Sequence, residues 1–488
     1  MNAVIRFMFV TVLCLMAVDS PARAQNRDSF EEFRRDVKSD FQSFRKTILE
    51  DYDKYLDGIW KEYQAFRGVE RNPLPKPRRP EVAGPDDVPQ GGGLPTPSEP
   101  KVPVVDQVPH DEPAAPNHYP EQPELFQVSF DFYGITGKMP ETGFERDLMQ
   151  LRDLKFSDLW RMYSKRNIAG FIVPAMQRAK AAYTLNDWLL FEFVRCYVNG
   201  VFADADANVR ISMIHYLFTH LGFDVRIGDV SGQPCLLVAI EQQVYGRVFA
   251  QIDGQKYYFF YDSSAGESQQ EGTFSTYDIP EDADRGRAMD LVIHEPLTIP
   301  YIPRSYKFCY GGLIISGEMN AALAPMLYHY PQMPIGCYAL SNVDGGLREN
   351  VSAQIRRQLA NVPRHQAVDR LLQFVQSAFD YATDDEQHGF EKPYFFEEML
   401  FYPQCDCEDR SIFYSFLLEN ALAVENMVIG FPNHEAVAVH LDEQFNGRWY
   451  NYGNKKFYIS DPTYIGAVTG ECMPEYRSVR PEIDFFTR

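Results

Sequence analysis

Three residues in the last fifth of the chain have the types and the order that nucleophilic thiol chemistry needs. Cys407 stands just before an apolar-periodic stretch that starts near Ser411, so we predict a helix with the thiol at its start. The free N–H groups and the positive end of a helix dipole favour a thiolate there. His434 opens a predicted strand and Asp461 ends another. A thiol, an imidazole that takes its proton and a carboxylate that orients the imidazole make a cysteine-dependent acyl-transfer site.

Each of these residues also has a structural interpretation. Cys407 is then an ordinary cysteine buried at a helix start, since a disulfide to Cys405 would close a strained Cys-x-Cys ring. His440 competes with His434 as the base, because residues six apart lie on the same face of a strand. Asp461 alone would be a turn residue before a proline. The occurrence of all three in this order favours catalysis.

A zinc site is the alternative use of the same region. Thiolate and imidazole are good zinc ligands, and Cys405, Cys407, His434 and His440 would supply them. The Cys-x-Cys spacing is not that of common zinc motifs, so we expect no metal and no organic cofactor.

The stretch that leads into the nucleophile is expected to line the cleft. Tyr402 and Gln404 are the candidates to help the Cys407 backbone N–H hold an oxyanion. As an alternative, either residue is simply part of a loop.

Three motifs of the C-terminal region resemble one known group of proteins. They are Asp406-Cys407-Glu408-Asp409 before an apolar helix, His434 followed by small and apolar residues, and Asp461-Pro462-Thr463. Together they resemble the transglutaminase-like cysteine hydrolase superfamily, especially its exported bacterial branch. The resemblance covers about residues 351–463.

This resemblance implies a papain-like α+β core. It also implies that Cys407 is the nucleophile, His434 the base and Asp461 the acid that orients the base. Two positions depart from the usual pattern, because Cys405 stands where a glycine commonly precedes the cysteine motif and Ala436 where an aromatic residue often follows the histidine.

The order of predicted elements occurs twice after residue 125. Each time, two amphipathic helices come first and strand-like runs follow. The predicted helices are Leu185–Phe202 and Val209–Leu221, then Ala367–Tyr381 and Ser411–Leu422; the predicted strands are Cys235–Ile240 and Tyr257–Tyr261, then Ala436–Leu441 and Arg448–Ser460.

The two series match in register, which suggests an internal duplication. Arg210 corresponds to Arg410 and Asp262 to Asp461, at offsets of 200 and 199 residues. Earlier in the two series the offset is 182, so about eighteen residues are inserted just before the cysteine motif. Chance similarity between two α+β segments is the alternative.

The first copy cannot perform thiol chemistry. Ala207 occupies the position of Cys407, and the position of His434 falls near Gln233. We therefore predict a degenerate domain over residues 125–343, with a scaffolding or binding role, and a catalytic domain over residues 344–488.

The N-terminus has the pattern of a signal peptide. Arg6 precedes the apolar run 7–18, and Ala22-Arg23-Ala24 is a small-x-small cleavage site. We predict a signal peptide over residues 1–24 and cleavage before Gln25. No segment reaches twenty apolar residues, so no transmembrane span is expected and the protein is predicted to be periplasmic or extracellular.

Two further segments precede the globular part. In residues 25–68 apolar side chains recur with spacings of 3, 4 and 4, which predicts a long amphipathic helix that serves self-association or docking to a partner. Residues 69–124 contain fifteen of the chain's 33 prolines and are predicted to be a disordered linker.

The charge of the chain limits its partners. Its 68 acidic and 47 basic residues give a net charge of −21, which argues against nucleic-acid binding. We expect an exported acyl-transfer enzyme, a peptidase, amidase or transglutaminase, that acts on a protein or peptide. The alternative is a non-catalytic envelope protein that binds or scaffolds. Hydrolysis and transamidation share one thioester, so the sequence does not separate them.

Overall fold

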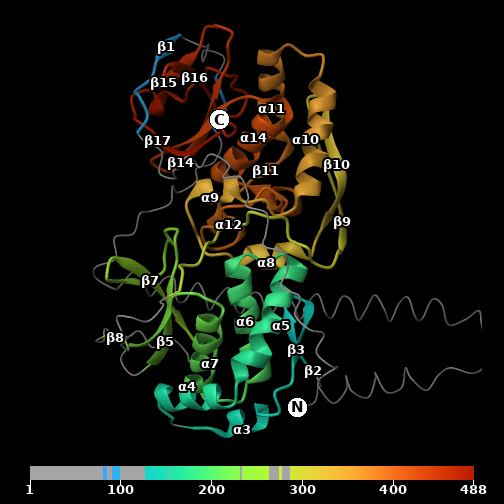
Figure 1. The fold of residues 1–488 in the computed structure, drawn as a ribbon. Helices are drawn as coiled ribbons and strands as arrows, with labels where there is room; N and C mark the ends of the chain where they lie inside the picture. Colours follow the sequence, from blue (N-terminus) through green and yellow to red (C-terminus); the bar gives the residue numbers. More distant parts are fainter. Residues whose placement is uncertain are drawn as a thin grey trace, which may run out of the picture. The chain divides into compact units, whose positions relative to one another are not determined.

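The computed structural model describes residues 81–84, 91–98, 127–152, 154–230, 233–262, 274–276 and 286–487. The predicted signal peptide, the predicted helix over residues 25–68 and most of the predicted linker lie outside these ranges. What is described is a mixed α+β structure with several antiparallel sheets (Figure 1). Within it, no helix is both long enough and apolar enough to cross a membrane.

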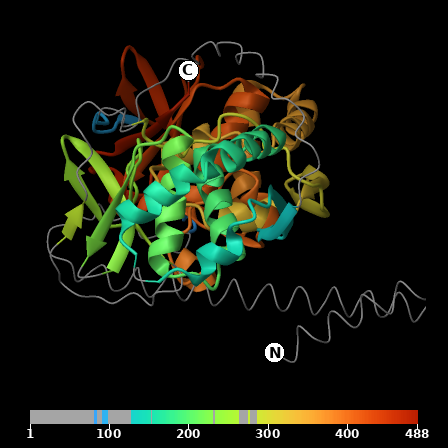
Figure 2. The same ribbon diagram turned by 60° about the horizontal axis from the view of Figure 1, so that its bottom comes forward.

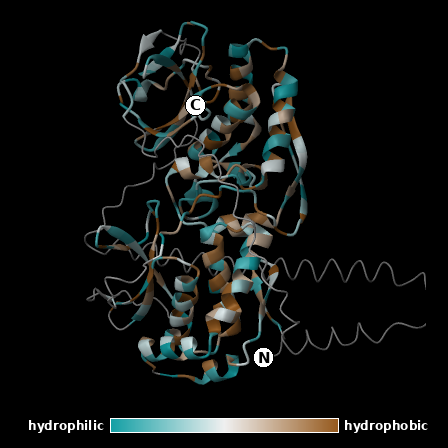
Figure 3. Ribbon diagram, in the orientation of Figure 1, coloured by the Kyte–Doolittle hydropathy of each residue, from teal (hydrophilic) through white to brown (hydrophobic). Residues whose placement is uncertain are grey.

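The first half begins with a hairpin and five helices and continues into a sheet. Ten of the fifteen residues of its central helix α6 are buried, and Figure 3 shows that helix largely in the hydrophobic colours. The sheet is antiparallel with the strand order β6-β7-β5-β4-β8. The elements of the first half are β2 (Gln127–Phe132), β3 (Ile135–Pro140), α3 (Glu145–Gln150), α4 (Phe156–Lys165), α5 (Ile168–Tyr183), α6 (Asp187–Val201), α7 (Ala207–His220), β4 (Val225–Val230), β5 (Gln233–Ala239), β6 (Phe249–Ile252), β7 (Gln255–Tyr261) and β8 (Phe274–Thr276).

A hairpin and two short helices connect the halves. They are β9 (Pro303–Tyr310), β10 (Leu313–Asn320), α8 (Leu323–Tyr328) and α9 (Ile335–Leu340). The sequence patterns did not predict the β9–β10 hairpin.

The second half places its long helices before its sheet. The strand order is β1-β15-β16-β14-β13-β17. Its elements are α10 (Gly345–Leu359), α11 (Arg364–Ala378), β11 (Asp380–Tyr381), α12 (Asp384–Gln387), α13 (Glu398–Phe401), β12 (Gln404–Cys405), α14 (Cys407–Leu422), β13 (Asn426–Phe431), β14 (His434–His440), β15 (Arg448–Tyr452), β16 (Lys455–Ser460), a 3-10 helix (Pro474–Tyr476) and β17 (Glu482–Phe486).

The two halves share one topology. Without β1, the second sheet has the order β15-β16-β14-β13-β17, which matches β6-β7-β5-β4-β8 strand for strand. In each half a helix, α7 or α14, directly precedes the first strand of the central hairpin. The predicted run Arg448–Ser460 folds as the hairpin β15–β16 rather than as one strand. The strand order is thus the one expected of an internal duplication.

The connections that lead into α7 and α14 differ in length between the halves. In the first half only residues 202–206 join α6 to α7, whereas residues 379–406 join α11 to α14. We call residues 379–406 the insertion; it contains β11, α12, α13 and β12.

Part of the proline-rich stretch belongs to the second sheet. β1 (Gly92–Gly93) pairs in parallel with Arg448 and Trp449 of β15. Figures 1 and 2 show the blue β1 segment beside the red strands of the second sheet. Leu94 follows, is buried in the core and donates its N–H to the Trp449 carbonyl at 2.7 Å. Residues 91–94 therefore cover the β15 edge, which would otherwise be open to other strands.

Candidate active site

Helix α14 places Cys407 in the interior of the second half. Twelve of its sixteen residues are buried, because helices α10 and α11 and strands β13 and β14 all pack against it. The Asp409 carboxylate accepts the Asp406 N–H at 3.1 Å, so the helix start is held by its own first turn. The Cys407 side chain lies on this turn and has no exposed surface.

His434 and Asp461 lie together at one end of the sheet. Strands β14 and β16 pair Val437 with Ser460, so the start of β14 faces the residue that follows β16. His434 Nε2 donates to Asp461 Oδ2 at 2.8 Å, and both side chains are buried. With its proton on Nε2, the imidazole keeps Nδ1 as its basic nitrogen.

Neighbouring groups fix this His–Asp pair in place. Asp461 Oδ1 accepts the backbone N–H groups of Thr463 at 2.8 Å and Tyr464 at 3.2 Å. The Tyr476 ring stacks on the His434 ring with 5.1 Å between centroids and 10° between planes. The carboxylate and the imidazole are therefore each held in one orientation.

The thiol itself contacts an acid. Cys407 Sγ donates to Glu408 Oε2 at 2.9 Å, and no hydrogen bond joins Cys407 to His434 among the described residues. Burial first, then the charges of Glu408 and Asp406, raise the pKa of the Cys407 thiol well above its usual value, although the Glu435 backbone N–H opposes this. In this arrangement the expected effect of the helix start is outweighed, and Cys407 is a protonated thiol.

The four residues of the zinc alternative are not gathered. Cys405 accepts from Arg410 Nε at 3.4 Å, and His440 Nδ1 faces the Lys456 carbonyl at 2.9 Å. His440 lies at the far end of β14, about 20 Å along the strand from His434. Neither group of clustered metal-ligating side chains in the described residues contains a cysteine or histidine.

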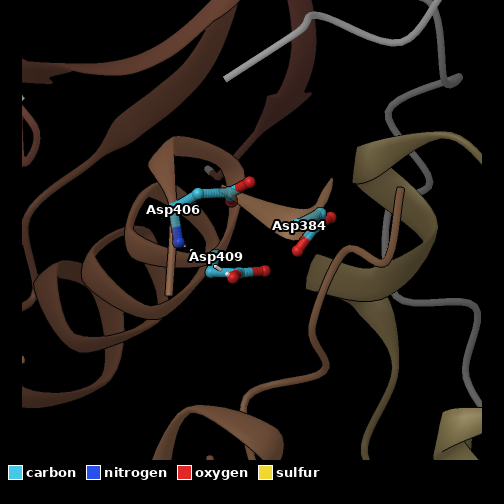
Figure 4. Close-up of side chains that lie close together, drawn as sticks. All are labelled: Asp384, Asp406 and Asp409. Carbon is cyan, nitrogen blue, oxygen red and sulfur yellow. Dashed lines mark hydrogen bonds between the residues drawn. The ribbon is translucent and has the colours of Figure 1, made fainter. Parts of the chain in front are cut away.

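Carboxyl groups do gather beside the thiol. Ligand atoms of Asp384, Asp406 and Asp409 lie within 4.8 Å of one another, and so do those of Asp384, Glu391 and Glu408. Figure 4 shows the Asp384 and Asp409 carboxyl groups pointing toward each other across the start of α14. We call these five residues the acidic cluster. The sequence predicts that Asp406, Glu408 and Asp409 cap the helix start and that the stretch with Asp384 and Glu391 lines the cleft. It does not predict that the five carboxyl groups meet.

The acidic cluster has the chemistry of a site for a hard cation. Burial and then a neighbouring carboxylate raise the pKa values of Asp384, Asp406 and Asp409 well above their usual range. Both Asp406 carboxyl oxygens and Glu408 Oε1 are buried without a hydrogen-bond partner among the described residues. Such oxygens are the ligands that Ca²⁺ prefers, so these five residues could hold one.

Two side chains tie the insertion and the Asp461 loop to the helices. The buried Arg410 guanidinium donates to the carbonyls of Gln376 at 3.1 Å and Phe379 at 2.8 Å. Gln376 Nε2 donates to the carbonyls of Asp461 and Tyr464, at 3.0 and 2.8 Å. The ends of α11 and α14 thus hold both loops that flank the catalytic candidates.

The predicted oxyanion residues lie in the insertion. Gln404 belongs to β12, where it pairs with Asp380. The Tyr402 ring packs in an aromatic group, 5.1 Å from the Tyr394 ring and 5.2 Å from the His388 ring.

The first half has no counterpart of the thiol and imidazole. Ala207 begins α7 as Cys407 begins α14, and Gln233 begins β5 as His434 begins β14. Comparison of the chain with protein-family models, with curated proteins and with solved structures found no match.

Proposed function

We propose that the second half is a thiol-dependent acyl-transfer enzyme of the transglutaminase-like kind. Cys407 is the nucleophile, His434 the base and Asp461 the orienting acid. The single observation that carries the proposal is the buried His434–Asp461 hydrogen bond of 2.8 Å, at the sheet end next to the start of α14. A structural histidine has no need of a carboxylate that is itself held by two backbone N–H groups.

The reaction would proceed through a thioester. His434 Nδ1 takes the proton of the Cys407 thiol, and the sulfur attacks a substrate carbonyl carbon. His434 then returns the proton to the leaving amine. Water or a second amine attacks the thioester, so the same side chains serve a peptidase, an amidase or a transglutaminase. The substrate would be a protein or peptide of the cell envelope, reached by export.

The buried thiol requires a rearrangement before a substrate can react. The Cys407 thiol must become accessible to the substrate. It must also break its hydrogen bond to Glu408 and form one with His434. The same observation favours the second candidate function, a non-catalytic binding or scaffold protein in which Cys407 is inert. For the first half we propose a degenerate copy with a scaffolding role, on the ground of its matching strand order.

Alkylation with iodoacetamide distinguishes the two functions. In the catalytic case Cys407 is alkylated at neutral pH, and His434→Ala lowers that rate by roughly 10² to 10⁴ because the base is lost. His440→Ala is the matched control on the same strand and should leave the rate unchanged. Peptide mapping by mass spectrometry assigns the label to Cys407 among the seven cysteines of the described residues. An equal rate in the His434→Ala protein would contradict catalysis.

A further inference from the structure

Tyr381 belongs to the insertion and pairs with a residue just before the nucleophile. β11 pairs in parallel with β12, which sets Tyr381 opposite Cys405, two residues before Cys407. The Arg410 guanidinium lies over the Tyr381 ring, 5.3 Å from its centroid. Strand pairing on one side and the buried arginine on the other leave the ring in a defined position.

The hydroxyl of Tyr381 is a donor without an acceptor. Its oxygen is buried and has no hydrogen-bond partner among the described residues. A buried hydroxyl in that condition loses its bond to water and gains nothing in return, so it is an exception that needs an explanation. Active sites position such hydrogen-bond donors to stabilise negative charge that develops only during the reaction.

The electrostatic surroundings keep this hydroxyl protonated. Burial is the largest cause that raises the pKa of Tyr381 far above its usual value, and repulsion from Cys407, Asp406 and Glu408 adds to it whenever those groups are ionised. Cys407 is thus within electrostatic reach of the phenol. A phenol that keeps its proton can donate a hydrogen bond at every pH at which the enzyme would work.

We propose that Tyr381 is a catalytic residue whose hydroxyl donates a hydrogen bond to the oxyanion formed when Cys407 attacks a substrate carbonyl. The inference rests on the proposed function and adds a residue to it. As the C–S bond forms, the carbonyl π pair moves onto oxygen, and the Tyr381 O–H stabilises that charge without giving up its proton. The pair then re-forms the carbonyl and expels the leaving group with the proton carried by His434.

This assignment differs from the sequence expectation in a testable way. The expected donors were Tyr402, whose ring packs with Tyr394 and His388, and Gln404 of β12. The first half offers independent support, because residues 202–206 are too few to supply a counterpart of β11. The half without a nucleophile also lacks the segment that carries this donor.

Two probes that react with the same sulfur separate oxyanion stabilisation from other effects. Iodoacetamide alkylates a thiol by displacement at a saturated carbon, so no oxyanion forms. p-Nitrophenyl acetate acylates it through a tetrahedral oxyanion and releases p-nitrophenolate. In the full-length Tyr381→Phe protein we expect acylation of Cys407 to slow by roughly a hundredfold, while alkylation of Cys407 keeps its rate. Tyr310→Phe is the control for removing a tyrosine hydroxyl, since Tyr310 is exposed on β9.

Each outcome decides the point. An unchanged acylation rate in Tyr381→Phe, or an equal fall of acylation and alkylation, overturns the oxyanion role while the proposed function stands. A selective loss of acylation in Tyr402→Phe or Gln404→Ala, with Tyr381→Phe unaffected, moves the role to that residue. Acylation that persists in Cys407→Ala overturns the proposed function and, with it, this inference.

Discussion

The two halves use equivalent aspartates in different ways. In the first half, Asp262 is bound by both Nε and Nη2 of Arg210, at 2.8 and 2.9 Å, and the pair is buried. In the second half, Asp461 binds His434 instead, although Arg410 occupies the position of Arg210. One sheet topology therefore carries a structural ion pair in one half and a candidate catalytic pair in the other.

The difference shows what frees an aspartate for catalysis. Arg410 is occupied by the carbonyls of Gln376 and Phe379, which it holds at the base of the insertion. In the first half the corresponding connection is only residues 202–206. The Arg210 guanidinium binds the carbonyls of Ala203 and Ala205 there and also reaches Asp262. The insertion thus supplies the Phe379 carbonyl and the Cys405 sulfur as partners for Arg410, and Asp461 pairs with His434 instead.

The largest expected effect concerns the nucleophile. Cys407→Ala should reduce p-nitrophenyl acetate turnover by roughly 10⁴-fold or more, because the thioester cannot form. Placing a thiol in the other half, as Ala207→Cys in the Cys407→Ala background, should restore nothing, since Gln233 begins β5 where a base would be needed. Recovered turnover in that double variant would mean that the halves differ less than proposed.

The buried ion pair of the first half should matter for stability. Arg210→Ala removes the charge that faces Asp262 and should lower the free energy of unfolding by about 3–5 kcal/mol. Urea denaturation followed by tyrosine and tryptophan fluorescence measures this. Arg161→Ala, which breaks an exposed ion pair with Asp158, is the control and should cost under about 1 kcal/mol. A small loss in Arg210→Ala would show that Asp262 is not held by charge.

The insertion also predicts a response to calcium in the second half. A Ca²⁺ ion at the acidic cluster should add about 2.7 kcal/mol to the free energy of unfolding at a hundred times its Kd. Asp384→Asn should abolish this gain, whereas Asp385→Asn, a neutralisation of the exposed neighbour, should keep it. Thermal unfolding with calcium and with a chelator provides the measurement. An equal gain in both variants would place the ion elsewhere.

Some of these differences were visible in the sequence because they are local. Apolar periodicity predicted the helices before and after Cys407, and the repeat in register predicted two sheets of one topology. The types and order of Cys407, His434 and Asp461 predicted that they belong together, and the His434–Asp461 contact agrees with this. The period and spacing of apolar residues are enough to predict helices and strands whose buried residues recur regularly along the chain.

Other parts of the site depend on how the insertion folds back on α14. Asp384 and Glu391 lie in a stretch that is expected to line the cleft. Because such a polar stretch would normally be solvated, no pattern indicates that Asp384 is buried beside Asp409 or that Glu391 lies near Glu408. The apolar period predicts a helix that ends at Tyr381, yet Tyr381 pairs in β11 because α11 ends at Ala378. Short strands that form only against a distant partner leave no periodic signal.

The smallest expected effect compares His215 with Ser415, which occupies the same place on the second helix. Burial lowers the pKa of His215 from 6.5 to about 4, and its Nε2 faces the Val225 carbonyl at 3.2 Å. The unfolded chain takes up a proton near pH 6.5 and the folded chain only near pH 4. The contribution of His215 is therefore complete above pH 6.5 and is lost as the pH falls toward 4.

At pH 5 this linkage should cost the first half about 2 kcal/mol relative to neutral pH. His215→Gln keeps an amide N–H for the Val225 carbonyl and removes the titration, so its unfolding midpoint in urea should shift less between pH 7 and pH 5. His294→Gln is the opposite control, because Asp290 raises the pKa of His294 and stability there is lost as the pH rises. Ser415 does not titrate, so α14 should lose no stability of this kind. If the second half lost as much stability as the first through α14 between pH 7 and pH 5, this difference between the halves would not exist.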